Sequence, residues 1–376
     1  MKNVRFIGLD VHAETIAVAV AESGGEVRSL GTIPNRPESV ARLIKKLGKP
    51  EQLRACYEAG PTGYVLYWQL AQLGVKCEVV APTLIPVKAG DRVKTDRRDA
   101  EKLARCHRAG DLTAVWVPDA AHEALRDLVR ARLAAKRDQL RARHRLGKFL
   151  LRQGRRAPEG ITAWANKHLT WIKQQRFEHT AQQVTLVDYL HEVEHVAERI
   201  IRLERSIDVA VQSMPAMQQA VIAGLQCLRG VAKVSAVTLV SELGQLSRFA
   251  AARQLMGYAG MVSREHSSGP RINRGSISKA GNAHLRRIVI EAAWNYRHPP
   301  ALGSTLRARQ NGASEPVKAI AWRAQHRLYQ RYRALMGRGK PKQKVVTALG
   351  RELLGFIWAI GCEIERSHSE EARLAA

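Results

Sequence analysis

The sequence predicts an α/β plus all-α protein: a mixed-sheet domain, a long helical and coiled-coil-like linker, and a mainly helical C-terminal domain. Three observations support this fold class. Strand and helix patterns alternate near the N-terminus, apolar residues then recur at helical spacing, and the remainder is helical in pattern apart from one glycine- and serine-rich loop. Because 376 residues exceed what one ordinary core serves, we expect domains at 1–118, 119–216 and 217–376.

The first domain begins with three β-rich runs in residues 4–32, which are VRFIGLD, TIAVAVAES and VRSLGTI. Turn signals separate the runs, so they predict a three-stranded meander. Helix and strand patterns then alternate, in the order PESVARLIKKLG, LRACYEAG, TGYVLYWQLAQLG, KCEVVAP and RRDAEKLARCHRAG. This alternation predicts a mixed central sheet with helices packed on it.

The linker begins with a strongly basic helical pattern at residues 119–156. Between Arg126 and Arg156, twelve Lys and Arg stand against two Asp. A charge run is usually a solvated face, but so few acidic residues in the same helix leave most of these cations without i,i+4 partners. We therefore expect phosphate contacts from cations of this helix, among them Arg130, Arg137, Arg141 and Arg145.

The rest of the linker changes character twice. Residues 157–183 predict an irregular connector with a short helix of its own. A heptad-like series interrupted at Glu204 follows, and it comprises Leu186, Leu190, Val193, Ala197, Ile200, Ile207 and Val211. Such a seam packs on a partner helix, either in the same chain or in a second subunit, and the pattern leaves both open. In the third domain, the loop HSSGPRINRGSISKAGN at residues 266–282 interrupts the helices.

The balance of charge indicates the kind of partner. With 61 Lys and Arg against 34 Asp and Glu, the net charge is +27, and a polyanion such as nucleic acid would offset the self-repulsion. A membrane surface is the alternative, but no window approaches 18 uncharged apolar residues, so we expect no membrane association. The five cysteines form no CxxC pair, and the N-terminus has no apolar leader, which predicts a cytoplasmic protein with reduced thiols.

Four acidic residues stand out in the α/β domain. Asp10 and Glu58 end two predicted strands, and Asp96 and Asp99 share one face at the start of a predicted helix. Sheets of this class place their sites at such positions. Each residue alone is more often a helix cap or an ordinary ion pair. Together, on a meander followed by further strands, they match the order of elements in ribonuclease-H-like domains.

Carboxylates gathered in a basic protein repel one another unless a cation lies between them. A divalent metal, Mg²⁺ or Mn²⁺, accepts oxygen ligands and keeps positions for water and phosphate oxygens. A pair of such ions stabilises the attacking and leaving oxygens in phosphodiester displacement. We expect the four carboxylates to bind metal and the adjacent cations to hold a nucleic-acid strand, namely Arg92, Lys94, Arg97 and Arg98.

FIGLDVH, CYEAGPTGY and KTDRRDA resemble the three acidic motifs of the DEDD insertion-sequence transposases, the one-ten family with its eleven-eleven subgroup, which includes a pilin-gene invertase. The resemblance implies a domain similar to the RuvC Holliday-junction resolvase, with acidic positions at Asp10, Glu58, Asp96 and Asp99. Near the C-terminus, YAGMVSREHSSGPRINRGSISKAGNAHLRR is similar to the signature of the family's second domain. That signature implies Ser268 as the nucleophile. The neighbouring Ser267 leaves this assignment open by one residue, and the loop cations Arg271, Arg274 and Lys279 either hold the scissile phosphate or are solvated.

The resemblance also implies an activity. Members excise and insert a mobile element through a circular intermediate, and a structured noncoding RNA of the element pairs with donor and target DNA. Serine attack would give a covalent phosphoserine–DNA intermediate beside the metal ions. The carboxylate domain of one subunit would meet the serine domain of another, in a dimer or tetramer. A DNA invertase without an RNA guide, a RuvC-like junction nuclease that uses water, and a non-catalytic nucleic-acid-binding protein remain as alternatives.

Overall fold

The structure, a computed structural model, describes residues 4–87, 90 and 94–374, so the predicted contact residue Arg92 lies outside the described residues. The chain forms two compact units. The first is Met1–Pro118 with Arg264–Gly281, and the second is Asp119–Ser263 with Asn282–Ala376. The finer division into three domains remains a prediction.

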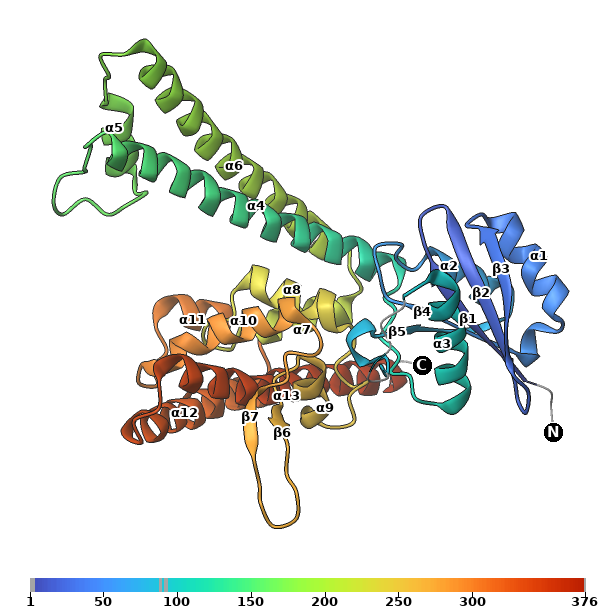
Figure 1. The fold of residues 1–376 in the computed structure, drawn as a ribbon. Helices are drawn as coiled ribbons and strands as arrows, with labels where there is room; N and C mark the ends of the chain where they lie inside the picture. The colour runs from blue at the N-terminus through green and yellow to red at the C-terminus, as the bar shows by residue number, and fades with distance from the viewer. Residues whose placement is uncertain (1–3, 88–89, 91–93, 375–376) are drawn as a thin grey trace. The chain divides into compact units, whose positions relative to one another are not determined.

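The first unit contains a five-stranded sheet in the order β3-β2-β1-β4-β5 (Figure 1). Its strands are β1 (Arg5–Val11), β2 (Thr15–Glu22), β3 (Val27–Pro34), β4 (Leu53–Glu58) and β5 (Lys76–Val80). The first three strands pair antiparallel, and β4 pairs parallel with both β1 and β5. The predicted mixed sheet, with its initial meander, is therefore confirmed.

Alternation along the strands separates two faces of this sheet. On one face, large side chains such as Ile7 and Leu9 of β1 pack against α1 (Pro37–Leu47) and α2 (Val65–Gln72). On the other face, alanines of β2 meet Ala100 and Ala104 of α3 (Asp96–Ala109). Gly8 of β1 also faces α3, and a Cβ there would collide with the Ala100 carbonyl oxygen and the Ala104 nitrogen. The absence of a side chain at Gly8 therefore lets the α3 backbone lie directly on β1.

The second unit begins with two long helices, α4 (Ala120–Arg152) and α6 (Thr180–Gln212), with the short α5 (Asn166–Gln174) between them. The two long helices pack side by side (Figure 1). Their apolar seam contains Ala135, Ala142, Leu146, Phe149 and Leu150 of α4 and Leu186, Leu190, Val193, Val196 and Ile200 of α6. The partner of the heptad series is thus a helix of the same chain. The pattern predicted Ala197 in the seam, but Val196 is the buried residue and Ala197 is half-buried. The two residues flank the centre of the seam.

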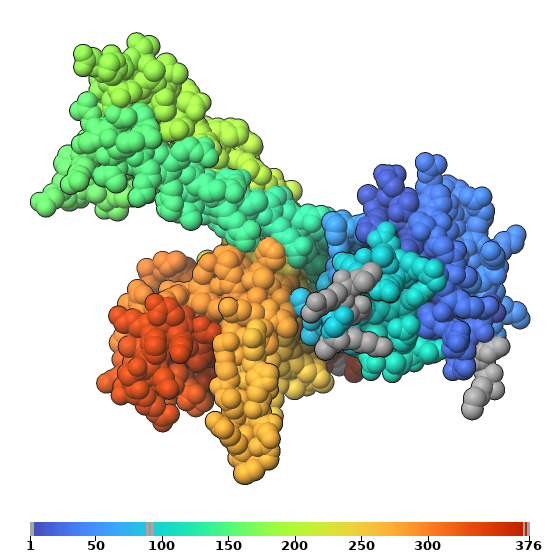
Figure 2. Space-filling view, in the orientation of Figure 1, coloured from blue at the N-terminus to red at the C-terminus, as the bar shows by residue number. Residues whose placement is uncertain are grey.

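The tip of the α4–α6 pair carries its own small core, visible as a separate lobe in Figure 2. Ile172 of α5 is fully buried there against Phe149, with Trp164 and Trp171 partly buried around it. Arg143 lies over the Trp164 ring, 5.3 Å from its centroid. The predicted connector therefore has its short helix, and that helix closes the end of the pair.

Acidic partners for the basic helix come from other helices. Glu204 interrupts the seam because it accepts a hydrogen bond from Arg132 Nε at 3.0 Å. Arg145 pairs with Glu192 of α6, and Arg199 of α6 pairs with Asp138 of α4. The described part of α4 has no i,i+4 ion pair, as the sequence predicted, and Arg141 pairs with Asp138 three residues before it. Several of the other cations have acidic partners on other helices, which a search within one helix does not find.

The remaining helices of the second unit form one body around α13 (Lys342–Leu374). They are α7 (Ala216–Leu225), α8 (Lys233–Leu243), α9 (Ala252–Tyr258), α10 (Ala283–Ala293), α11 (Ser304–Arg309) and α12 (Glu315–Gly337). Within α13, Lys342–Glu370 is long and apolar enough to cross a membrane by length and composition, although Arg351 and Glu352 interrupt its apolar residues. Half of its most apolar stretch is buried inside the protein, with Leu349, Leu353 and Ile357 fully buried. That burial is the pattern of a core helix.

The glycine- and serine-rich segment is more ordered than the predicted loop. β6 (Ser263–Glu265) and β7 (Arg274–Ile277) pair as a two-stranded sheet, so the segment is a β-hairpin. The polar and glycine-rich composition hid the strands, because none of the apolar alternation that marks a half-buried strand is present.

Candidate active site: a carboxylate cluster and a serine hairpin

The position of Asp10 follows from strand alternation. Asp10 is two residues after Gly8, so its side chain emerges on the sheet face that α3 covers. It stands near the end of β1, and its side chain is 18% exposed. The close contact between the backbones of β1 and α3 at Gly8 therefore sets the distance from the start of α3 to this carboxylate.

The start of α3 supplies two further carboxylates. Thr95 caps the helix, and its hydroxyl accepts a hydrogen bond from the Arg98 backbone N–H at 3.3 Å. Asp96 and Asp99 follow in the first turn. Because Thr95 does the capping, the alternative in which the two aspartates cap the helix does not hold.

His12 joins Asp10 to Asp96. Its Nε2 lies 3.3 Å from Asp10 Oδ2 and 3.5 Å from Asp96 Oδ1. One ligand atom from each of these three residues lies within 4.8 Å of the others. His12 lies in the motif FIGLDVH, but it is not among the site residues that the sequence predicted. Its i,i+2 spacing from Asp10, which places both side chains on one face of an extended chain, was the available signal.

The pKa of Asp10 reports the crowding of charge. Burial raises the pKa of this carboxyl above its ordinary value, the carboxylates of Asp99 and Asp96 raise it further, and His12 opposes them. The ionised form of Asp10 is thus disfavoured by its surroundings. A bound cation would reverse that balance.

Glu58 ends β4, the parallel neighbour of β1, and faces the same open cavity as Asp10. The cavity has a volume of about 520 Å³, and His12 and Asn35 also line it. Asp99 influences Asp10 electrostatically and lies 4.0 Å from Lys94 Nζ. The structure therefore brings Asp10 and Asp96 together through His12, with Glu58 in the wall of the adjoining cavity and Asp99 beside them.

These residues fit a divalent metal. Carboxylate oxygens are the ligands that Mg²⁺ and Mn²⁺ prefer, and the imidazole nitrogen of His12 is a better ligand for Mn²⁺ than for Mg²⁺. Burial and the neighbouring carboxylates both raise the pKa of Asp10, and a bound cation would favour its ionised form against both. Asp10, His12 and Asp96 are the residues placed to hold it.

The predicted cations of the first unit lie around α3. Lys94 is 88% exposed, Arg98 is exposed, and Arg97 donates a hydrogen bond to Glu101 at 2.9 Å. On α4, Arg137 is exposed, while Arg141 and Arg145 pair with Asp138 and Glu192. Surface ion pairs of this kind are weak and exchange readily for phosphate. The roles of these cations in nucleic-acid binding remain predictions.

Arg130, whose side chain is 41% exposed, is placed differently, because it pairs with a buried carboxylate. Glu242 of α8 is fully buried and accepts hydrogen bonds from Arg130 Nε and Nη2 at 2.9 and 3.0 Å and from Asn282 Nδ2 at 2.7 Å. Arg126 Nε lies 3.8 Å from its carboxylate. Burial alone would raise the pKa of Glu242, but these partners outweigh burial and hold the pKa below its ordinary value. Asn282 also caps α10, so the network ties α4, α8 and α10 together.

Ser268 lies at the tip of the β6–β7 hairpin. Its backbone N–H donates to the Arg271 carbonyl at 3.1 Å, and the Arg271 N–H donates to the Ser268 carbonyl at 3.2 Å. Gly269 and Pro270 form the turn, with Gly269 at φ 56°, a left-handed value that favours glycine. Arg271, Arg274 and Lys279 are exposed on the same hairpin.

The two neighbouring serines differ in their hydroxyl contacts. Ser267 Oγ donates to Glu265 at 2.9 Å and accepts from the Asn273 N–H at 3.2 Å. The hydrogen bonds from Ser267 and Arg274 hold the pKa of Glu265 below its ordinary value, so Glu265 is a weak base. Among the described residues, the Ser268 hydroxyl makes no side-chain hydrogen bond.

Comparisons with known proteins agree over nearly the whole chain. The family model described as "Transposase IS116/IS110/IS902 family" matches residues 223–304, and a DEDD-type model described as "Transposase" matches residues 7–153. The putative transposase y4qE of Sinorhizobium fredii is 46% identical over 97% of this chain and 90% of its own length. The transposase for insertion sequence element IS1533 of Leptospira borgpetersenii is 33% identical over 92% of this chain and 99% of its own length. The pilin gene-inverting protein of Moraxella bovis is 23% identical over 78% and 76% of the two chains.

Proposed function

The chain belongs to the IS116/IS110/IS902 family of insertion-sequence transposases, and we propose that it cleaves and rejoins DNA through a covalent serine intermediate, under the guidance of a noncoding RNA. Family membership makes it an enzyme that acts on DNA and uses divalent metal. The serine, the guide RNA and the assembly are parts of the proposal.

The Asp10–His12–Asp96 cluster carries the proposal. Three potential ligands within 4.8 Å, beside a cavity lined by Glu58, match what phosphodiester chemistry requires of a metal site. When bound, a divalent metal stabilises charge on the phosphate oxygens. The exposed cations Lys94 and Arg98 hold the DNA backbone, and the partly buried Asp10 keeps its carboxylate aimed at the cavity.

Ser268 is the proposed nucleophile. Its oxygen bonds to phosphorus as the bond from phosphorus to the leaving strand oxygen breaks, and its proton passes to a base. Two observations favour Ser268 over Ser267: the Ser267 hydroxyl is engaged by Glu265 and Asn273, and the low pKa of Glu265 makes it a poor proton acceptor. Arg271, Arg274 and Lys279 hold the scissile phosphate.

The net charge of +27 suits a complex that contains both DNA and RNA. The reaction takes place in the cytoplasm with Mg²⁺ or Mn²⁺. The working form is a homo-oligomer, a dimer or tetramer, in which carboxylate and serine parts of different subunits meet.

A denaturing gel tests the covalent step. Purified protein is incubated with labelled DNA carrying the element's ends, the flanking transcript and Mg²⁺ or Mn²⁺, with Ser268→Ala and Ser267→Ala alongside. We expect a protein–DNA adduct that needs metal, disappears in Ser268→Ala and persists in Ser267→Ala. Dependence of the adduct on the transcript tests the guide.

The alternatives predict other patterns on the same gel. An adduct that forms without any transcript favours a site-specific invertase, the possibility that similarity to the pilin gene-inverting protein supports. Cleavage without an adduct in any of the three proteins identifies a junction nuclease that uses water. Binding without cleavage identifies a non-catalytic nucleic-acid-binding protein.

A further inference from the structure

The exposed face of α12 carries a row of ring side chains that the proposed reaction does not use. Trp322, His326, Tyr329 and Arg333 are spaced by four, three and four residues, so they form one stripe along the helix. The opposite face is buried through Val317, Ile320, Ala321, Ala324, Gln325 and Leu328. The stripe is therefore turned outward, and Trp322 is 41% exposed.

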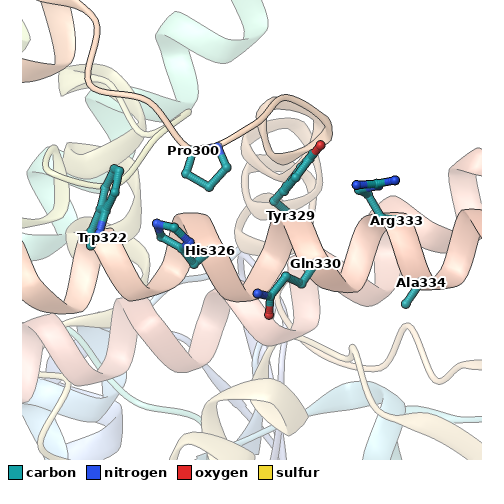
Figure 3. Close-up of a pocket in the computed structure, with 7 residues that line it drawn as sticks. All are labelled: Pro300, Trp322, His326, Tyr329, Gln330, Arg333 and Ala334. Carbon is teal, nitrogen blue, oxygen red and sulfur yellow. The ribbon is translucent and has the colours of Figure 1, made fainter.

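These residues line a shallow groove that is open to solvent. Pro300 overhangs the stripe from the segment before α11, and Gln330 and Ala334 complete the lining (Figure 3). The groove has a volume of about 690 Å³. The Trp322 and His326 rings pack edge to face with centroids 4.6 Å apart, which fixes the orientation of the indole. A flat ring can thus stack there on a surface that is already ordered.

The groove combines three kinds of contact. Trp322 and Tyr329 offer ring faces and edges, the Gln330 amide offers both donors and an acceptor, and Arg333 offers a cation at one end. Within Glu315–Gly337 the helix has five Lys and Arg against one Glu, so its charge favours an anionic occupant. Arg327 and Arg331 pair with Glu352, whereas Arg333 lies in the groove lining itself.

Trp322 and Arg333 are eleven residues apart, about 16 Å along the helix. We propose that this groove binds an unpaired stretch of two or three nucleotides of the DNA substrate, with one base stacked on Trp322 and a phosphate further along the same strand held by Arg333. Stacking requires the base faces, which a duplex hides and which strand cleavage and exchange expose. The inference rests on DNA being the substrate in the proposed function. The groove would be an additional site that holds a DNA strand while that strand is unpaired.

Comparing two oligonucleotides separates the contribution of the bases to binding from that of the phosphates. Binding of the full-length protein to 20-nucleotide oligothymidine and to an abasic strand of equal length is measured by fluorescence anisotropy at raised salt, which weakens phosphate contacts elsewhere. We expect wild type to prefer oligothymidine. Trp322→Ala should reduce its affinity for oligothymidine about tenfold and leave the abasic strand unchanged, and Trp322→Phe should restore most of the preference.

Arg333→Ala tests the phosphate contact, with Arg323→Ala as its matched control. Arg323 is exposed on the same helix but lies outside the groove lining. Arg333→Ala should weaken binding of both strands more than Arg323→Ala does. Melting temperatures of all variants check folding, and Trp322→Phe and Arg333→Ala carry the test if Trp322→Ala does not fold.

The proposal is overturned if wild type binds both strands equally, or if Trp322→Ala keeps the preference. The proposal is also overturned if Trp322→Ala loses binding to single-stranded RNA but keeps its binding to single-stranded DNA. That result would assign the groove to RNA. These results are independent of the adduct gel. Failure of the serine chemistry leaves oligothymidine binding intact, and failure of the groove leaves the adduct in place.

Discussion

Asp10 and Glu242 are both at least partly buried carboxylates, but their surroundings shift their pKa values in opposite directions. Glu242 is fully buried and receives hydrogen bonds from Arg130 and Asn282, so its pKa lies below its ordinary value. The pKa of Asp10 is raised, first by burial and then by the carboxylates of Asp99 and Asp96, and the single imidazole of His12 opposes the rise. The comparison separates a structural carboxylate from one that we propose to be functional. The fold gives Glu242 fixed hydrogen-bond donors, whereas the charge of Asp10 would be balanced by a bound cation.

Asp10→Asn should have the largest effect, on activity alone. Removing this ligand should reduce strand cleavage about a thousandfold or more, because metal stabilisation of the transition state is worth several kcal/mol. The melting temperature should not fall, since the change removes one of several mutually repelling carboxylates. Cleavage assays and thermal unfolding of the same preparation check both halves. A variant that melts well below wild type would give Asp10 a structural role and undo the contrast with Glu242.

Glu242→Gln should show the reverse, a loss of stability. Removing the charge of a buried carboxylate costs about 3–5 kcal/mol, because the buried Arg126 then keeps its charge without this carboxylate and the 41% exposed Arg130 loses its two hydrogen bonds to it. Urea unfolding measures the change. Glu291→Gln is the matched control, since Glu291 pairs with Arg287 at the surface of α10 and should cost no more than about 1 kcal/mol. Equal losses for the two variants would contradict the importance of burial.

Gly8→Ala should connect stability to activity. The added Cβ collides with the backbone of α3 at Ala100 and Ala104, and overpacking of this kind costs about 1–3 kcal/mol. Cleavage should fall as well, because Asp96 and Asp99 move with α3. Gly24→Ala is the control, since nothing lies within 4 Å of a Cβ there. Normal cleavage by Gly8→Ala would show that the site does not depend on this contact.

His12→Ala should change which metal works best. The imidazole favours Mn²⁺ over Mg²⁺, so its removal should raise the Mn²⁺ concentration needed for half-maximal cleavage about tenfold and affect Mg²⁺ less. Metal titrations of cleavage measure this. His195→Ala, at an exposed position of α6, is a histidine control. Equal effects on both metals would mean that His12 orients Asp10 and Asp96 without contributing a ligand.

The smallest effect concerns pH. Because the pKa of Glu242 is lowered from 4.5, its ion pair stabilises the fold above that value, and the contribution is lost as pH falls through the lower folded pKa. The difference in unfolding free energy between wild type and Glu242→Gln should therefore be constant near neutrality and shrink below about pH 4.5. Urea titrations at several pH values follow it. A difference that grows on acidification would reverse the sign of the pKa shift.

Local patterns predicted the sheet and its carboxylates because both are local in origin. Alternation identified β1 and β4, and a helix start identified Asp96 and Asp99. His12 was overlooked because its i,i+2 spacing places it near Asp10 alone, and its second partner, Asp96, is distant in the chain. The partners of the basic helix were missed for the same reason, since Glu192, Glu204 and Glu242 come from distant parts of the chain.

The serine hairpin was the hardest part to predict. Its strands are polar, and a serine next to glycine is usually a turn residue, so composition predicted a loop around Ser268. Only the resemblance to a family pointed to that serine. The contacts of Ser267 with Glu265 and Asn273 come from the folded hairpin, and no spacing rule predicts which of two adjacent hydroxyls they leave free.

The contact at Gly8 has a consequence for sequence drift. Because α3 rests on the main chain of β1, the separation of Asp10 from Asp96 and Asp99 is set by backbone, and substitutions among the large side chains on the other face of the sheet leave it unchanged. In copies of this gene that accumulate such substitutions, the protein would become less soluble and less stable before the positions of the aspartates changed. A single methyl group at residue 8 would instead displace Asp96 and Asp99 from Asp10 while the protein stayed folded.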